Sequence, residues 1–81
     1  MSEAPSDEAI VEAAAEAAEN VVFSRFEHSE VEDFDVTATF EDGVLEVDVY
    51  VNAPEKSDRV VENTADDAAL AARGAVDDLF A

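Results

Sequence analysis

The chain lacks cysteine and tryptophan and has little glycine, proline or positive charge: 2 Gly, 2 Pro and 4 Lys and Arg among 81 residues. Without cysteine it forms no disulfide, as is usual in a reducing cytoplasm. With only Gly43 and Gly74, it has no glycine-rich phosphate loop. No apolar run is long enough to cross a membrane. The acidic start, MSEAPSDEAI, has no basic segment before an apolar one, so we expect no signal peptide and a cytoplasmic protein.

Negative charge is abundant instead: 22 acidic residues give a net charge of −18. Such self-repulsion opposes compaction, but at about 1 M salt the Debye length falls to roughly 3 Å. A disordered chain would have little hydrophobicity, whereas this one is 48% hydrophobic and patterned. The composition therefore predicts a folded halophilic protein that gathers diffuse cations and water at high salt.

At 81 residues, the chain has room for one domain, residues 1–81, with a thin core. We expect residues 1–5 to be flexible and a helix over residues 6–22, with Ser6 as its N-cap. Its apolar stripe consists of Ile10, Ala14, Ala17 and Val21. Phe23 and Phe26 would project onto the acidic side of a longer helix, so we expect the helix to end near Val22 and both rings to fold over the end of the core.

Two alternating segments, DFDVTATF and VLEVDVYVN, predict a β-hairpin with strands over residues 33–40 and 44–52. Between them, Asp42-Gly43 is a strong signal for a two-residue turn. That turn sets apolar residues opposite one another: Phe40 with Leu45, Ala38 with Val47, Val36 with Val49, and Phe34 with Val51. A slip of one residue would put the two faces out of phase, so the register is well specified.

A second helix is expected over residues 58–80, with an apolar stripe of Val61, Ala65, Ala68, Ala72, Val76 and Leu79. A start after Thr64 is the alternative, which leaves residues 57–64 open, but typical loop lengths favour the earlier start. The predicted fold is α+β: a two-layer α-β-β-α domain, with an antiparallel β-hairpin covered on one face by two helices.

The sequence contains no convincing catalytic or metal-binding motif. EDFDVTATFEDG has acids, but valine, threonine and alanine stand where a calcium loop needs ligands. His28 is the single histidine, which leaves zinc without a ligand set. Ser24 and His28, four residues apart, are the one nucleophile–base pair, and no third residue orients the imidazole. We therefore expect a protein that is not an enzyme, with no catalytic residue, metal or cofactor.

A protein partner is expected rather than nucleic acid, since four dispersed basic residues cannot neutralise a phosphate backbone. A two-stranded sheet is marginal alone, and both of its strands are edges. Pairing VLEVDVYV with a second copy or a related subunit would give a four-stranded sheet. The apolar residues most available for contacts are Val44, Tyr50 and Leu70, although scattered exposed apolar residues are also ordinary.

The whole chain resembles a small archaeal family of uncharacterised proteins, a domain of unknown function, through FEDGVLEVDVYV and DDAALAARGAVDDLF. Genes of that family are often found near prefoldin beta and the small dimerising subunit of the KEOPS complex, which makes threonylcarbamoyladenosine in tRNA. Residues 33–80 are also similar in shape to that KEOPS subunit, which has a hairpin leading into an amphipathic helix and dimerises. This chain departs from it by starting with an acidic helix rather than a strand.

These observations favour a non-catalytic interaction or accessory subunit of a cytoplasmic complex in a halophilic archaeon. The resemblance implies one version, a partner of the KEOPS dimerising subunit in tRNA modification. A prefoldin-associated chaperone factor and a cation- or small-molecule-binding protein are the alternatives. Homodimer, heterodimer and monomer stay open, as does the identity of the partner.

Overall fold

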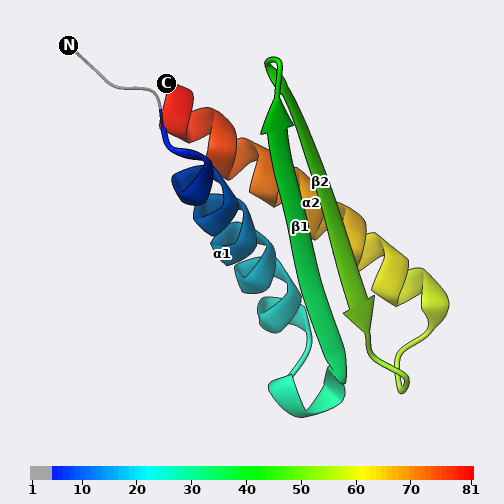
Figure 1. Ribbon diagram of the computed structural model, residues 1–81. Helices are drawn as coiled ribbons and strands as arrows, with labels where there is room; N and C mark the ends of the chain where they lie inside the picture. Colours follow the sequence, from blue (N-terminus) through cyan, green and yellow to red (C-terminus); the bar gives the residue numbers. More distant parts are fainter. Residues whose placement is uncertain (1–4) are drawn as a thin grey trace.

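A computed structural model describes residues 5–81 (Figure 1). The elements follow the order α1 (Asp7–Arg25), a 3-10 turn η1 (His28–Glu30), β1 (Asp33–Glu41), β2 (Val44–Asn52) and α2 (Asp58–Phe80). Most of the segment expected to be flexible, residues 1–5, lies outside the described residues. Within the described part of the chain, no helix is long and apolar enough to cross a membrane.

Serine hydroxyl groups fix where both helices begin. The Ser6 hydroxyl accepts a hydrogen bond from the Ala9 N–H (3.1 Å), and the Ser57 hydroxyl accepts one from the Val60 N–H (3.3 Å). Each bond satisfies one of the backbone donors that a first helical turn leaves free. The cap at Ser57 settles the open question about residues 57–64: α2 begins at Asp58, the earlier of the two starts.

The end of α1 differs from the prediction, because the helix continues past Val22 to Arg25. Phe26 is buried as expected, at the C-cap position. Phe23 is half-buried because the following loop and β1 cover it: its ring stacks on His28 (centroids 4.0 Å apart) and meets the edge of Phe34 (5.5 Å). The helix therefore does not have to stop at Phe23, because His28 and Phe34, which lie outside the helix, shield that ring from water.

The hairpin has the predicted register, with Phe40 opposite Leu45 and Val36 opposite Val49. Its turn places Asp42 (φ 53°) and Gly43 (φ 77°) in the left-handed region. Two consecutive left-handed residues define the type I′ turn, whose twist matches that of the paired strands. Strand β1 extends one residue beyond the prediction, to Glu41, which pairs with Val44.

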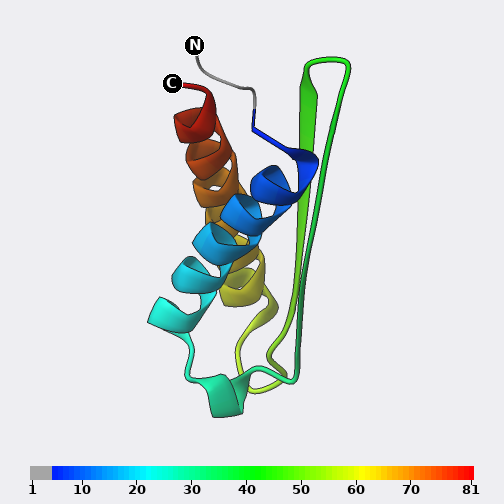
Figure 2. The same cartoon turned by 60° about the vertical axis from the view of Figure 1, so that its left-hand side comes forward.

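Both helices lie on one face of the hairpin, and α1 crosses α2 (Figure 2). The α+β fold is thus confirmed as two layers in the order helix, strand, strand, helix. The buried row of α1 is Ile10, Ala14, Ala18 and Val22, and that of α2 is Thr64, Ala68, Ala72 and Val76. Four-residue ridges of this kind interdigitate where two helices cross.

The predicted stripes were partly wrong. They were assigned from an average helical rotation of 100° per residue, whereas the buried residues follow ridges with a spacing of four. Ala17, Val21, Val61 and Ala65 are half-buried at the margins of the contact, and Leu79 is 40% exposed. The reason is that the alanines allow the helices to approach closely, so the core narrows to one ridge on each helix.

Two ion pairs join segments of residues 5–81 at the surface. Arg25 of α1 binds Asp67 of α2 (2.7 Å), and Lys56 binds Glu30 (2.8 Å). The Lys56 ammonium also lies 5.7 Å from the centre of the Phe26 ring, so it covers that end of the core. Exposed pairs contribute little to stability, so the fold depends mainly on burial.

The close helix contact yields a stability prediction. We expect Ala68→Leu to lower the free energy of unfolding by about 1–3 kcal/mol, since a larger side chain has no space in the ridge. Chemical denaturation followed by circular dichroism measures this. Glu62→Leu, on the exposed side of the same helix, should change stability by less than about 0.5 kcal/mol. An equal loss in both variants would contradict the close packing.

The pair at Glu30 and Lys56 predicts a dependence on pH. The Lys56 ammonium and the Glu27 N–H hold the pKa of Glu30 below its ordinary 4.5. The contribution of the Glu30 carboxylate to stability is therefore fully present above about pH 4.5, and it is lost as the pH falls through the lowered pKa. The same bond raises the pKa of Lys56 above 10.5, so its contribution is present below 10.5 and is lost at higher pH.

We expect Glu30→Gln to lose less stability than the parent between about pH 5 and pH 3. Unfolding measured across that range tests this, with the exposed neighbour Glu32→Gln as the control. If the two variants follow the same curve, the pair contributes nothing to the pH dependence.

The net charge of −18 predicts a dependence on salt. We expect the melting temperature to rise between about 0.1 and 2 M KCl as screening removes self-repulsion. Replacing Glu12, Glu16 and Glu19, all exposed on α1, by glutamine should weaken that rise. A melting temperature that is insensitive to KCl in both proteins would contradict the expectation.

Candidate functional site

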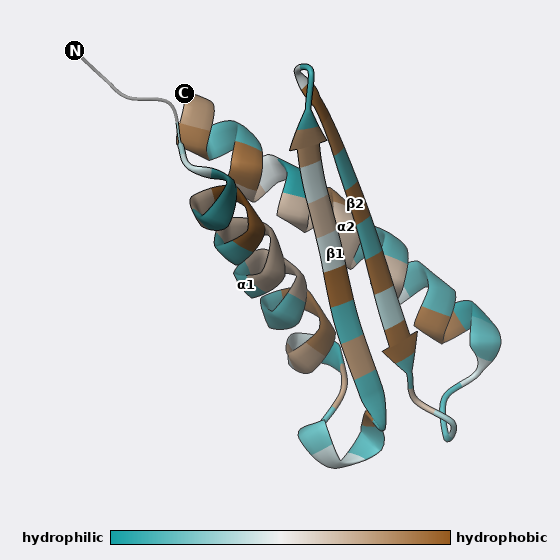
Figure 3. Ribbon diagram, in the orientation of Figure 1, coloured by the Kyte–Doolittle hydropathy of each residue, from teal (hydrophilic) through white to brown (hydrophobic). Residues whose placement is uncertain are grey.

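The hairpin has one open face, because both helices lie on the other. Along each strand, side chains that point to this open face alternate with apolar side chains that point to the core, as the colours in Figure 3 show. It presents Asp33, Asp35, Thr37, Thr39 and Glu41 from β1, and Val44, Glu46, Asp48, Tyr50 and Asn52 from β2. Five of these side chains are carboxylates and none is basic.

The carboxylates of the open face are staggered across the two strands. Asp35 lies opposite Tyr50, and Asp33 lies opposite Asn52. The remaining pairs are Thr37 with Asp48, Thr39 with Glu46, and Glu41 with Val44. Like charges directly opposite each other destabilise a sheet, and this register contains no such pair. The hairpin therefore tolerates an acidic face without a cation between its strands.

Both edges of the hairpin carry free backbone groups. A two-residue turn makes its flanking residues, Glu41 and Val44, a hydrogen-bonded pair, and such pairs alternate with non-hydrogen-bonded ones. Every pair on the open face is thus hydrogen-bonded, and the core-facing pairs direct their N–H and C=O groups outward. The outward groups of the β2 edge belong to Leu45, Val47, Val49 and Val51, and those of the β1 edge to Phe34, Val36, Ala38 and Phe40.

The residues predicted for partner contacts are all exposed: Val44 (59%), Tyr50 (57%) and Leu70 (65%). Val44 and Tyr50 share the open face of β2, about 20 Å apart along the strand and separated by Glu46 and Asp48. Leu70 lies on the side of α2 opposite its buried ridge. The structure therefore does not bring Leu70 together with the other two, and it places no single apolar patch on the hairpin.

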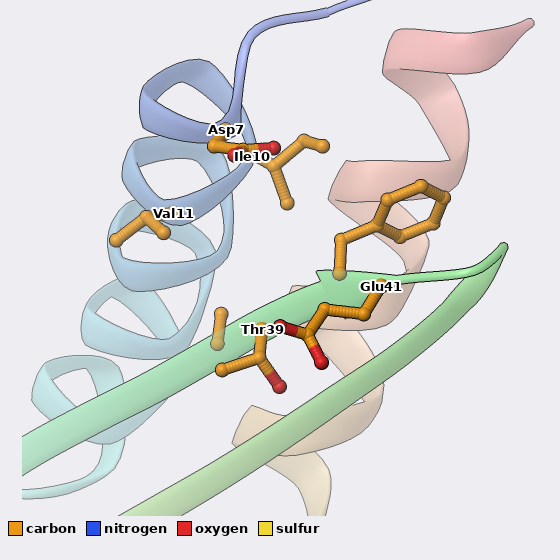
Figure 4. A pocket seen from close by; sticks show the side chains of 7 residues that line it. Asp7, Ile10, Val11, Thr39 and Glu41 are labelled. Carbon is orange, nitrogen blue, oxygen red and sulfur yellow. The ribbon is translucent and has the colours of Figure 1, made fainter.

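A groove between the start of α1 and the end of β1 was not predicted from the sequence. It has a volume of about 220 Å³ and is lined by Asp7, Ile10, Val11, Ala38, Thr39, Phe40 and Glu41 (Figure 4). At one side the Phe80 ring, 47% exposed, stacks on Phe40 with centroids 5.3 Å apart. The signal was available, since Val11 and Phe80 are large apolar residues that fit neither predicted stripe.

The residues that the sequence offered for catalysis are engaged elsewhere. The Ser24 hydroxyl donates a hydrogen bond to the Val21 carbonyl (2.8 Å), and His28 stacks on Phe23. Across residues 5–81, no group of three or more His, Asp or Glu side chains is placed to hold a metal ion. Of the features described above, the two strand edges, the open face and the groove have a shape for binding. A shallower hollow of about 270 Å³ also lies between α1 and α2, lined by Ala13, Glu16, Ala17, Asn20 and Ala75.

Comparison with known proteins bears out the archaeal resemblance. Residues 5–79 match a family described as Protein of unknown function (DUF3194). An uncharacterised protein of Natronomonas pharaonis is 49% identical over 79 residues, which cover 98% of this chain and 93% of the relative. No solved structure matches the chain. The family match spans nearly all of the chain, and the chain therefore belongs to the DUF3194 family.

Proposed function

We propose that the protein is a non-catalytic accessory subunit of a cytoplasmic complex, which binds its partner by pairing the free edge of β2 with a strand of that partner. The observation that carries this proposal is the β2 edge itself. Its outward N–H and C=O groups come from four successive core-facing positions, Leu45, Val47, Val49 and Val51. Such an edge is a template for strand addition.

The incomplete core supports the same proposal. Of the core-facing hairpin residues, Val47 and Val51 are buried. The others are half-buried: Phe34, Val36, Ala38, Phe40, Leu45 and Val49. Added strands would extend the apolar face and remove more of this surface from water, at about 25 cal/mol per Å². A two-stranded sheet gains more from such an extension than a larger sheet would.

The charges restrict how a second copy could pair at this edge. A symmetric antiparallel register centred on Asp48 would set two aspartates opposite each other, which is unfavourable. A register centred on Val49 sets Asp48 opposite Tyr50 and Glu46 opposite Asn52 of the second copy. A related but less acidic subunit would avoid the repulsion more completely. In residues 33–80 the hairpin leads directly into α2. The sequence resemblance implies the same arrangement for the KEOPS dimerising subunit, and this supports a partner of that kind, in tRNA modification.

Two proline variants test the β2 edge. Val49→Pro removes an outward N–H from β2 and leaves the bonds between β1 and β2 in place, as proline does at sheet edges. Val36→Pro is the matched control, because Val36 is the cross-strand partner of Val49, is also half-buried and has its N–H on the β1 edge. Circular dichroism is used first to check that both variants fold.

The measurement is light scattering with size-exclusion chromatography at about 2–3 M KCl. The protein is run alone and mixed with the small KEOPS dimerising subunit of a haloarchaeon. We expect a discrete dimer or a one-to-one complex that Val36→Pro keeps and Val49→Pro loses. If the protein stays monomeric in both runs, or if the two variants behave alike, the β2 edge is not the binding site.

A further inference from the structure

The groove between α1 and β1 lies along the outer edge of the strand. Its strand wall consists of four consecutive residues, 38–41. Successive strand residues point to opposite faces, so Ala38 and Phe40 lie on the helix side while Thr39 and Glu41 lie on the open face. The facing wall is the first turn of α1, with Asp7, and the residues just after it, Ile10 and Val11 (Figure 4).

Free backbone groups lie along the strand edge that borders this groove. Ala38 and Phe40 belong to non-hydrogen-bonded pairs with Val47 and Leu45, so their N–H and C=O groups point away from β2. The groove thus offers two donors and two acceptors at the spacing of a β-ladder. An extended segment lying in the groove would satisfy them as a third strand of the hairpin.

The walls of the groove are apolar and its mouth is acidic. Ile10 is buried beneath it, while Val11 is 41% exposed at its side. Phe80 of α2 supports Phe40 by stacking, which holds that ring in place. Asp7 and Glu41 supply two exposed carboxylates, and none of the seven lining residues is basic. The site therefore suits an apolar side chain whose neighbours in the chain are basic.

We propose that this groove binds an extended segment of another protein in which apolar and basic residues alternate, added as a strand along the outer edge of β1. Alternation places the apolar side chains toward Ile10 and Val11 and the basic ones toward Glu41 and the acidic open face. A second copy of this chain fits poorly, since its own strands carry five carboxylates and no basic residue. The site is separate from the β2 edge, so the protein can join two partners.

Peptide binding tests this proposal. The probe is a fluorescein-labelled hexapeptide, Lys-Val-Arg-Val-Lys-Val, titrated with the full chain and followed by fluorescence anisotropy. The titrations are made at about 0.5 and 2 M KCl, after circular dichroism has been used to check that the protein is folded at both concentrations. We expect saturable binding of this peptide that weakens as the salt concentration rises. The acidic peptide Glu-Val-Glu-Val-Glu-Val should not bind. A Lys-Val-Arg-Val-Lys-Val peptide with N-methyl groups on its valines should also fail, because it cannot complete the ladder from that side.

Two matched variants locate the site. Val11→Lys removes an apolar wall and adds a like charge, so it should weaken binding by about tenfold or more. Val60→Lys makes the same change on α2 at a similarly exposed position (43%), and it should change affinity by less than about twofold. The proposal is overturned if no binding occurs, if both variants weaken it equally, or if the acidic peptide binds as well. Binding that persists in Val49→Pro would separate this site from the β2 edge.

Discussion

The close contact between α1 and α2 is the constraint on which the other features depend. Ala14 and Ala18 of α1 and Ala68 and Ala72 of α2 are fully buried, in the ridges where the two helices pack together. Because these side chains are small, two helices fit side by side beneath a hairpin only two strands wide. The helices thereby fix which face of the hairpin is covered, and they leave the opposite face and both strand edges free.

The hairpin and the bounds of α2 were predictable because local signals agreed: the alternation, the Asp42-Gly43 turn and the Ser57 cap all favour the same structure. The end of α1 was not, since Phe23 is shielded by His28 and Phe34, which the helical pattern does not contain. The buried ridges were predicted in part: Ile10 and Ala14 of α1 and Ala68, Ala72 and Val76 of α2 are buried as expected. Ala18, Val22 and Thr64 were missed, because the partner helix decides which residues are covered.

The candidate sites were predictable to a smaller extent. The exposure of Val44, Tyr50 and Leu70 follows from strand alternation and helical periodicity, and the structure shows it. Their separation follows from the layer order, which places Leu70 on the side of α2 away from the hairpin. The groove was not foreseen, because Asp7 and Glu41 are 34 positions apart in the chain (41 − 7) and meet only through the packing of α1 on β1.

The register of the hairpin gives its core-facing residues two roles and its open-face residues one. At Leu45, Val47, Val49 and Val51, the side chain belongs to the core while the backbone forms the free edge of β2. A side-chain substitution at these positions therefore acts on the core, whereas proline also removes a donor from the free edge. The open-face positions between them do not have this double role, and their charges can adapt to solvent while core and edge stay unchanged.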